Sequence, residues 1–355
     1  MTLLEMLALL TSYIFLAICS AQKVDTVEEL LAQPIPEEAN KLSGKALVDY
    51  VNSRQSFFKA KYSPEAEQRL EHLMRPEFIR NARTLYNVTK AEKPILNDII
   101  PESFDARKEW KNCSSITYIR DQSKCGSCWA VSAAETMSDR ICVQTRGKVQ
   151  KLISDVDILA CCGDACGEGC EGGYDHKAWE FAKEFGVCTG GRFQEQGVCK
   201  PYPFHPCGFY DGKWYNCPRD HLFKTPACKK YCQYGYGKRY DKDKVYAKSV
   251  YILDEDEKAI QREMMKNGPV QAAFIVYEDF SYYTSGIYVH KYGRQTGGHA
   301  VKVVGWGVDK WDGTKYWIVA NSWGSDWGEN GYFRILRGVN HCEFESYVVS
   351  GEFRV

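Results

Sequence analysis

The pattern of apolar and polar residues predicts one long buried helix in the middle of the chain. After the stretch CGSC, which ends at Cys128, apolar residues recur at helical spacing from Ala130 to Ile141, and Gly147 can end the helix. We therefore expect a helix that begins near Ser127 and places Cys128 in its first turn.

Two apolar, β-branched runs nearer the C-terminus predict strands. In TGGHAVKVVGWG, His299 follows two glycines and leads into the run. We expect His299 at the start of this strand, with open space on its glycine side. The run YWIVANSW predicts a second strand that ends in Asn321 and Trp323.

The N-terminal part of the chain has a different pattern. An apolar run from Met6 to Ala21 ends in small residues and is shorter than the roughly 20 residues of a membrane span, so we expect a cleaved secretory signal over residues 1–21. Glu5 precedes this run without a Lys or Arg, which leaves a signal anchor as the alternative. Residues 22–100 are charged and helix-patterned, and we expect a pro-segment that folds against a larger domain.

Composition and cysteine placement limit the partners and the compartment. The chain has 46 Lys and Arg against 46 Asp and Glu, so we expect neither a nucleic-acid partner nor a membrane partner. All cysteines except Cys19 lie from Cys113 onward, and 16 cysteines are too many for a reducing cytosol unless they bind metal or do redox chemistry. We expect an oxidising compartment, and the sequon at Asn87 predicts glycosylation of the pro-segment.

Three residues in the predicted elements have the chemistry of an acyl-transfer site. At a helix N-terminus, unpaired N–H groups and the helix dipole favour a thiolate at Cys128. The imidazole of His299 can take the thiol proton, and the amide of Asn321 can orient that imidazole. Alternatively, Cys125 and Cys128 are disulfide cysteines or a thioredoxin-like redox pair, but no βαβ pattern surrounds them and the odd number of downstream cysteines leaves at least one unpaired.

From about Pro101 to its end, the chain resembles the papain family of cysteine peptidases, and within that family cathepsin B. The resemblance rests on DQSKCGSCW, TGGHAV and ANSW. It implies a two-domain α+β fold in which a helical domain carries Cys128 and a β-barrel domain carries His299 and Asn321, with the active-site cleft between them. It also implies hydrolysis of peptide bonds through an acyl-enzyme, without a metal or organic cofactor, by a peptidase domain over residues 101–355.

The spacing between Cys128 and His299 exceeds the roughly 130 to 150 residues of papain-like enzymes, which indicates an insertion. Cathepsin B carries such an insertion, the occluding loop, and residues 199–232 occupy its place. Two adjacent histidines of that loop hold the C-terminal carboxylate of a substrate, but Phe209 and Tyr210 stand there in this chain. We therefore expect mainly an endopeptidase. Nearby cations that could substitute are His205, Lys213 and His221.

The resemblance also assigns roles to further residues. Gln122 would donate to the oxyanion beside the backbone N–H of Cys128, and Trp323 would shield the histidine–asparagine hydrogen bond from water. Gly172 and Gly173 match a glycine pair that lets a substrate backbone come close, although a plain turn is an equal alternative. The other substrate-binding positions implied are Tyr174, Gly298 and Tyr347.

Two departures from the family pattern lie close to these positions. Tyr347 stands where mammalian cathepsin B has an acidic residue in the pocket for the substrate residue two before the scissile bond, the P2 residue. We therefore expect apolar P2 residues to be preferred over Arg. Ser123 and Lys124 replace the Gly-Ser usual before CGSC, which leaves the shape of that turn open.

Twelve cysteines are paired by the resemblance. Cys128 stays free for chemistry, while Cys188 and Cys342 are either buried thiols or a further pair. A zinc site in CCGDACGEGC is an alternative that needs reduced thiolates. The implied pairs are Cys113 with Cys142, Cys125 with Cys170, Cys161 with Cys228, Cys162 with Cys166, Cys199 with Cys232, and Cys207 with Cys217.

The implied partners are protein and peptide substrates, the chain's own pro-segment as an inhibitor, and cystatin-type inhibitors, in a secreted or lysosomal setting. The run YWIVANSWGSDWGE is similar to a motif of cathepsin B-like peptidases in blood-feeding nematodes, so digestion of haemoglobin is a further expectation. The alternative from another class is a catalytically inactive, disulfide-rich binding protein on the same fold. Such a protein is expected to have lost at least one of Gln122, Cys128, His299 and Asn321, and none is lost.

Overall fold

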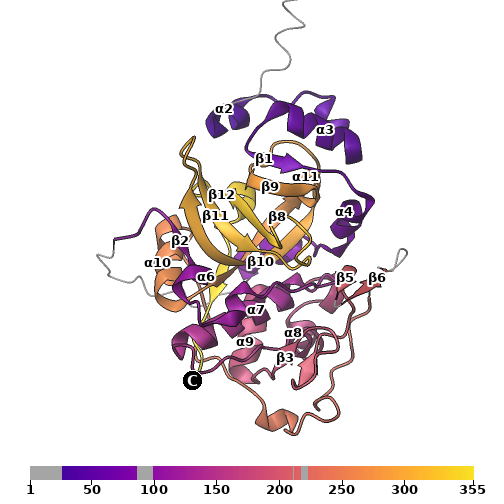
Figure 1. The fold of residues 1–355 in the computed structure, drawn as a ribbon, viewed down its shortest axis with the longest axis vertical. Helices are drawn as coiled ribbons and strands as arrows, with labels where there is room; N and C mark the ends of the chain where they lie inside the picture. The colour runs from indigo at the N-terminus through magenta and orange to yellow at the C-terminus, as the bar shows by residue number, and fades with distance from the viewer. Residues whose placement is uncertain (1–25, 86–98, 211, 217–222) are drawn as a thin grey trace, which may run out of the picture.

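The computed structural model of the chain describes residues 26–85, 99–210, 212–216 and 223–355. Figure 1 shows two lobes, with most strands in the upper one and helices α7, α8 and α9 in the lower one. The fold is therefore of the expected α+β, two-domain class. Within the described residues, no helix has both the length and the apolar character needed to cross a membrane.

Helix α7, Cys128–Gln144, forms the centre of the helical lobe. It begins directly after Ser127, as predicted, and nearly all of its residues are buried because α8, α9 and strand β10 pack around it. Helix α7 therefore packs on the other helices of its own lobe and also on the sheet lobe. The other helices of this lobe span Asp155–Cys161 (α8), Asp175–Glu184 (α9) and Ala106–Glu109 (α6).

The sheet lobe is one mixed sheet with the strand order β1, β9, β12, β11, β10, β8, β13 and β7, in which β2 also pairs with β10. Strand β10, Gln295–Val308, pairs antiparallel with β8 and β11. Helix α10, Glu257–Asn267, packs against β8 and β10. The other elements are Phe58–Ala60 (β1), Phe104–Asp105 (β2), Tyr251–Ile252 (β7), Val270–Tyr277 (β8), Glu278–Ser281 (α11), Tyr283–Tyr288 (β9), Lys315–Ala320 (β11), Tyr332–Leu336 (β12) and Val348–Ser350 (β13).

One strand boundary differs from the prediction. Because the ladder with β8 already includes Gln295 and Gly298, His299 lies inside β10 and not at its start. The strand predicted from YWIVANSW ends at Ala320, and Asn321 follows it immediately. Strand β10, which contains His299, packs against α7.

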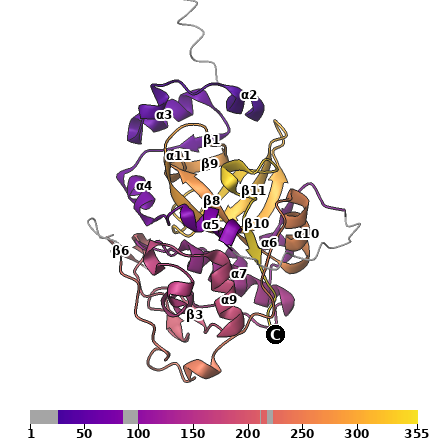
Figure 2. The same ribbon diagram turned by 180° about the vertical axis from the view of Figure 1, so that it is seen from behind.

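Residues 26–85, the main described part of the expected pro-segment, wrap around the sheet lobe and then pass between the lobes (Figures 1 and 2). Strand β1 pairs antiparallel with β9 and extends the sheet, while Leu47 and Val51 of α3 are buried in the core of the sheet lobe. The helix-patterned segment thus packs on the larger domain, as expected. Its helices span Val27–Ala32 (α2), Gly44–Arg54 (α3), Pro64–Arg69 (α4) and Glu77–Leu85 (α5).

The inserted loop, residues 199–232, contains a short hairpin of Gly208–Tyr210 (β5) and Lys213–Tyr215 (β6), in which Phe209 is the partner of Trp214. Figures 1 and 2 both place this hairpin beside α4 of the pro-segment. Shorter strands of the same lobe are Gly190–Gly191 (β3) and Lys200–Pro201 (β4). His221, Cys217 and the sequon at Asn87 lie outside the described residues.

Five of the six implied disulfides are present in the structure, and Cys207 is also disulfide-bonded, although its expected partner lies outside the described residues. All four cysteines of CCGDACGEGC are in disulfides, which leaves no thiolate there for the alternative zinc site. Cys188 and Cys342 are free thiols and are not paired with each other. The bridges are Cys113–Cys142, Cys125–Cys170, Cys161–Cys228, Cys162–Cys166 and Cys199–Cys232.

Candidate active site

The turn before α7 holds Cys128 at the boundary between the lobes. The disulfide between Cys125 and Cys170 anchors this turn, and the backbone N–H of Gly126 donates to the Cys170 carbonyl at 2.7 Å. A Cβ atom at Gly126 would meet that carbonyl oxygen at 2.4 Å, so only glycine fits. Cys128 is consequently fixed as the first residue of the helix.

Ser123 and Lys124 do not disrupt the turn before Cys125. Ser123 has φ +55°, a left-handed conformation that glycine adopts more readily, and its N–H donates to Asp121 Oδ1 at 2.7 Å. Ser123 thus adopts the left-handed conformation in this turn without being a glycine. The Lys124 side chain is only 1% exposed, a burial that the sequence analysis did not predict.

His299 and Asn321 are joined by a hydrogen bond of 2.7 Å between Nε2 and Oδ1, and both residues are fully buried. Trp323 stacks on the imidazole, with ring centroids 5.0 Å apart. Because an amide oxygen only accepts hydrogen bonds, Nε2 carries the proton and Nδ1 is left as an acceptor. Among the described residues, Nδ1 has no hydrogen-bond partner. The imidazole is thus oriented for accepting a proton at Nδ1.

The nucleophile and the base lie in the same part of the interface between the lobes. The backbone N–H of Ala300, the residue after His299 in β10, bonds to the Cys128 sulfur and favours its thiolate form. The structure thus brings together Cys128, His299 and Asn321, which lie far apart in the sequence.

Gln122 is held at the expected position of an oxyanion donor. Ser322 Oγ donates to Gln122 Oε1 at 2.6 Å, and the Gln122 backbone N–H donates to the Ser322 carbonyl at 2.8 Å. These bonds fix which way the amide points. Its Nε2 donates to the Cys125 carbonyl at 3.0 Å and to the carbonyl of His72, in the pro-segment, at 3.1 Å. The amide that the resemblance assigns to the oxyanion is thus hydrogen-bonded to a carbonyl of the pro-segment.

The space expected on the glycine side of His299 is filled by the pro-segment. Gly298 exchanges two backbone hydrogen bonds with Met74, at 3.0 and 2.7 Å. A Cβ atom at Gly172 would meet the ring of Phe78 at 2.6 Å, whereas one at Gly173 would meet the ring of Trp129 inside the helical lobe. Gly172 and Gly298 thus contact the pro-segment, while Gly173 is required by internal packing.

Burial under the pro-segment determines the protonation of the site. Burial raises the pKa of the Cys128 thiol to about 12, although neighbouring backbone N–H groups oppose this. Burial lowers the pKa of the His299 imidazole to about 4, against the opposite effect of its hydrogen bond to Asn321. Burial under the pro-segment thus opposes both the thiolate expected at the helix N-terminus and the imidazolium.

Tyr347, which is expected in the P2 pocket, and Tyr174 both contact the ring of His176. The Tyr347 hydroxyl lies 2.5 Å from His176 Nδ1 and is buried, and Tyr174 contacts Phe78 of the pro-segment edge to face at 5.0 Å. The sequence analysis missed Asp175, which is 1% exposed and whose carboxylate has no hydrogen-bond partner among the described residues. Burial raises the pKa of this carboxyl well above its usual range and so disfavours its charged form. Its position directly after Gly172, Gly173 and Tyr174 was the feature of the sequence that could have identified it.

Comparison with known proteins decides the family. The sequence pattern of the family described as "Papain family cysteine protease" matches residues 100–352. The chain belongs to the papain family of cysteine proteases. The match spans the described site from Gln122 to Tyr347.

Relatives within the papain family cover nearly the whole chain. "Cathepsin B-like cysteine proteinase 1" of Ostertagia ostertagi is 48% identical over 341 residues, which are 96% of this chain and 98% of that protein. "Gut-specific cysteine proteinase" of Caenorhabditis elegans is 46% identical over 88% of this chain and 92% of its own length. The solved structure "proCathepsin B S9 from Trypanosoma congolense" is 36% identical, has a TM-score of 0.72, and covers 87% of this chain and 98% of that one. The chain is thus a cathepsin B-like cysteine peptidase.

Proposed function

We propose that the chain, once its pro-segment is removed, hydrolyses peptide bonds with Cys128 as the nucleophile. The His72 carbonyl at Gln122 is the observation that carries this proposal, because it puts a peptide carbonyl at the oxyanion donor beside the nucleophile. Loss of the pro-segment lets water reach Cys128 and His299 and so favours the ion pair of thiolate and imidazolium.

The reaction then proceeds in two stages. The Cys128 thiolate attacks the scissile carbonyl, and Gln122 Nε2 and the Cys128 backbone N–H stabilise the oxyanion. The imidazolium of His299 gives its proton to the leaving amine and then takes one from the water that hydrolyses the thioester. Asn321 holds the imidazole through Nε2 in both stages.

The pro-segment acts as an inhibitor that is already bound. Its contacts with Gln122 and Gly298 support this role, because both are expected substrate-binding positions. We infer a signal over residues 1–21, a pro-segment over 22–100 and cleavage near Ile100. The preceding residue, Ile99, is 90% exposed, which makes this part of the chain accessible to a protease.

The P2 pocket favours apolar residues. Its wall includes the rings of Tyr174 and Tyr347, and burial disfavours the charged form of the Asp175 carboxyl. An arginine at P2 would lose its hydration without gaining a fixed negative charge.

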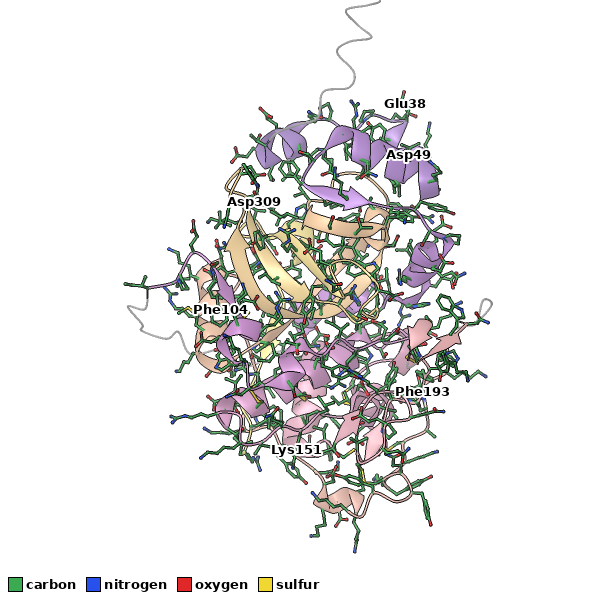
Figure 3. All side chains as sticks on the ribbon, viewed as in Figure 1. Glu38, Asp49, Phe104, Lys151, Phe193 and Asp309 are labelled. Carbon is green, nitrogen blue, oxygen red and sulfur yellow. A yellow bond between two sulfur atoms is a disulfide. The ribbon has the colours of Figure 1, made fainter. Side chains whose placement is uncertain are left out.

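The enzyme is mainly an endopeptidase. Two cations that the sequence offered as replacements for the histidine pair contact aromatic rings of the inserted loop itself: His205 stacks on Tyr215 at 5.5 Å, and Lys213 Nζ lies 4.9 Å from the centre of the same ring. Phe193, labelled in Figure 3, also contacts His205 and Tyr215. These contacts support a hairpin that grips or covers a substrate without binding its C-terminal carboxylate.

The setting follows from the relatives. We infer a secreted or lysosomal enzyme that digests dietary protein, including haemoglobin, and that is controlled by cystatin-type inhibitors. The printed name of one relative, a gut-specific cysteine proteinase, supports a digestive role. Glycosylation at Asn87 belongs to the same proposal.

Titration with a thiol-directed epoxide inhibitor tests the central role of Cys128. One equivalent should abolish peptidase activity and label Cys128 in the processed chain, while a Cys128→Ser variant should take up no label. An inactive binding protein on the same fold would show neither peptidase activity nor stoichiometric labelling. Label at Cys188 or Cys342 in its place would contradict the assignment.

A further inference from the structure

A buried lysine lies next to the catalytic turn and is paired with a carboxylate of the pro-segment. The Lys124 Nζ lies 2.9 Å from Glu71 Oε2, and their side chains are 1% and 55% exposed. Lys124 directly precedes Cys125, whose disulfide anchors the turn. The cation is therefore held close to the site, while the carboxylate comes from a segment that is lost on activation.

The path of the pro-segment shows on which side of the scissile position this pair lies. The His72 carbonyl is at Gln122, Met74 pairs with Gly298, and Phe78 lies against Gly172 and Tyr174. Residues after His72 thus run along the half of the cleft expected to hold the acyl part of a substrate. Glu71 precedes His72 and lies on the other half, which holds the leaving-group part, the primed side.

The inserted loop supports the same placement. The backbone N–H of Phe223 donates to the Lys124 carbonyl at 2.8 Å, and Ser123 Oγ lies 3.6 Å from the sulfur of Cys207. Lys124 is therefore packed against the loop that is expected to bound the primed side. It is a cation outside the inserted loop, separate from the loop residues His205 and Lys213.

We propose that Lys124 binds a carboxylate of the substrate on the primed side of the scissile bond. This proposal rests on the proposed peptidase function and adds a substrate preference to it. The carboxylate of Glu71 is a stand-in for that ligand, since it is presented by a peptide lying in the same cleft. A charge-assisted hydrogen bond from a held ammonium recognises a carboxylate but not the neutral amide of the same shape.

Two parts of a substrate could supply this carboxylate. One is the side chain of Asp or Glu within a longer polypeptide, and the other is the C-terminal carboxylate of a peptide. Glu71 is a side chain within a continuous chain, so the structure favours the first source. That source also agrees with an enzyme that is mainly an endopeptidase.

The test uses the processed enzyme and internally quenched peptides that differ at one residue. Each peptide has a C-terminal amide and carries Glu or Gln at the first, second or third primed position. At the best position we expect kcat/KM to be roughly tenfold higher for Glu than for Gln, as for other charge-assisted hydrogen bonds. A shorter pair that differs only in a free C-terminal acid or its amide tests the second source.

Substitutions of Lys124 show whether it is responsible. Lys124→Ser restores the residue usual in the family, and Lys124→Met keeps the length of the side chain; both should reduce the Glu-to-Gln ratio to about one. Lys124→Arg should keep most of it. Lys224→Met is the matched control. It removes an exposed positive charge from the inserted loop, and it should change neither the Glu-to-Gln ratio nor the turnover.

Each outcome decides the proposal. A ratio near one in the unsubstituted enzyme, or a ratio unchanged in both Lys124→Ser and Lys124→Met, overturns it. A free-acid preference that disappears in these variants supports Lys124 as a carboxylate site and assigns the C-terminal source. Failure of the proposed peptidase function would be a different result, because no peptide would then be cleaved.

Discussion

The two halves of the cleft hold the same pro-segment by different means. On the half expected to hold the acyl part of a substrate, Met74 pairs with Gly298 through the backbone and Phe78 contacts the ring of Tyr174. On the primed half, an ion pair joins Glu71 to Lys124. Backbone pairing accepts any peptide, whereas a held charge discriminates. We therefore expect shape and apolar area to decide specificity on one side of the scissile bond, and charge on the other.

The largest effect should appear at the boundary between these halves, at the nucleophile itself. Because burial raises the pKa of Cys128 to about 12, the thiolate forms in the intact chain only as the pH approaches that value. Alkylation of Cys128 by iodoacetamide at pH 7 should therefore be at least about 10³-fold slower before removal of the pro-segment than after it. Peptide mass spectrometry separates Cys128 from the other free thiols.

The processed enzyme should show a bell-shaped dependence of kcat/KM on pH. The rate should rise as the thiolate forms and fall as His299 loses its proton, which favours acid to neutral pH. Equal alkylation rates in the two forms, or a rate that still climbs above pH 9, would contradict the assignment.

Removal of the oxyanion donor should slow the cleavage of all substrates equally, whichever residues bind in the two halves of the cleft. Gln122→Ala should lower kcat by about 10²–10³, the usual cost of losing one such donor. Preferences on either side of the scissile bond should stay the same. Ser322→Ala, which removes only the hydroxyl that donates to Gln122 Oε1, should have a smaller effect in the same steady-state assay. A change in P2 preference with Gln122→Ala would show that the halves are not independent.

The P2 pocket offers a smaller effect, confined to one half. Peptides with Leu, Val or Phe at P2 should be cleaved roughly tenfold faster than those with Arg, since a buried guanidinium needs a charged partner. Tyr347→Glu should narrow or reverse this preference. Tyr347→Phe, which removes only the hydroxyl that contacts His176, should keep it. Faster cleavage of peptides with Arg at P2 by the unsubstituted enzyme would mean that a charge is supplied by Asp175 or by Glu343, which pairs with Arg80 of the pro-segment.

The smallest effect concerns the ion pair in the intact chain. Glu71 is about half exposed, so the pair is screened by water and Glu71→Gln should speed processing of the pro-segment only about threefold. Glu77→Gln, an exposed change in the same segment, is the control and should have no effect. Gel analysis of processing over time provides the measurement, and equal rates in all three proteins would show that the pair does not hold the pro-segment.

Local pattern was sufficient where the determinants of structure are local. The helix from Cys128 follows from apolar spacing, and the site residues follow from short motifs that the fold brings together. Strand β1 was missed because the three residues Phe58–Ala60 are too short to show a period, and their partner β9 lies far along the chain. The strand containing His299 begins earlier than expected because glycines carry no apolar signal.

Properties that depend on distant segments could not be predicted from the sequence. The raised pKa of the Cys128 thiol results from burial beneath a distant segment, which the local motif does not contain. Lys124 pairs with Glu71, and the sequence around neither charged residue indicates a partner. The resemblance to a family did not help there, since Lys124 is a departure from its pattern.

Sequencing of the cleavage sites in a large set of proteome-derived peptides tests the difference between the two halves most directly. The processed enzyme would be incubated with peptides of mixed sequence, and the products identified by mass spectrometry. We predict apolar residues at P2 and an excess of Asp and Glu at one primed position, with the excess lost in Lys124→Ser. Basic residues at P2 together with no acidic excess on the primed side would contradict our description of the cleft.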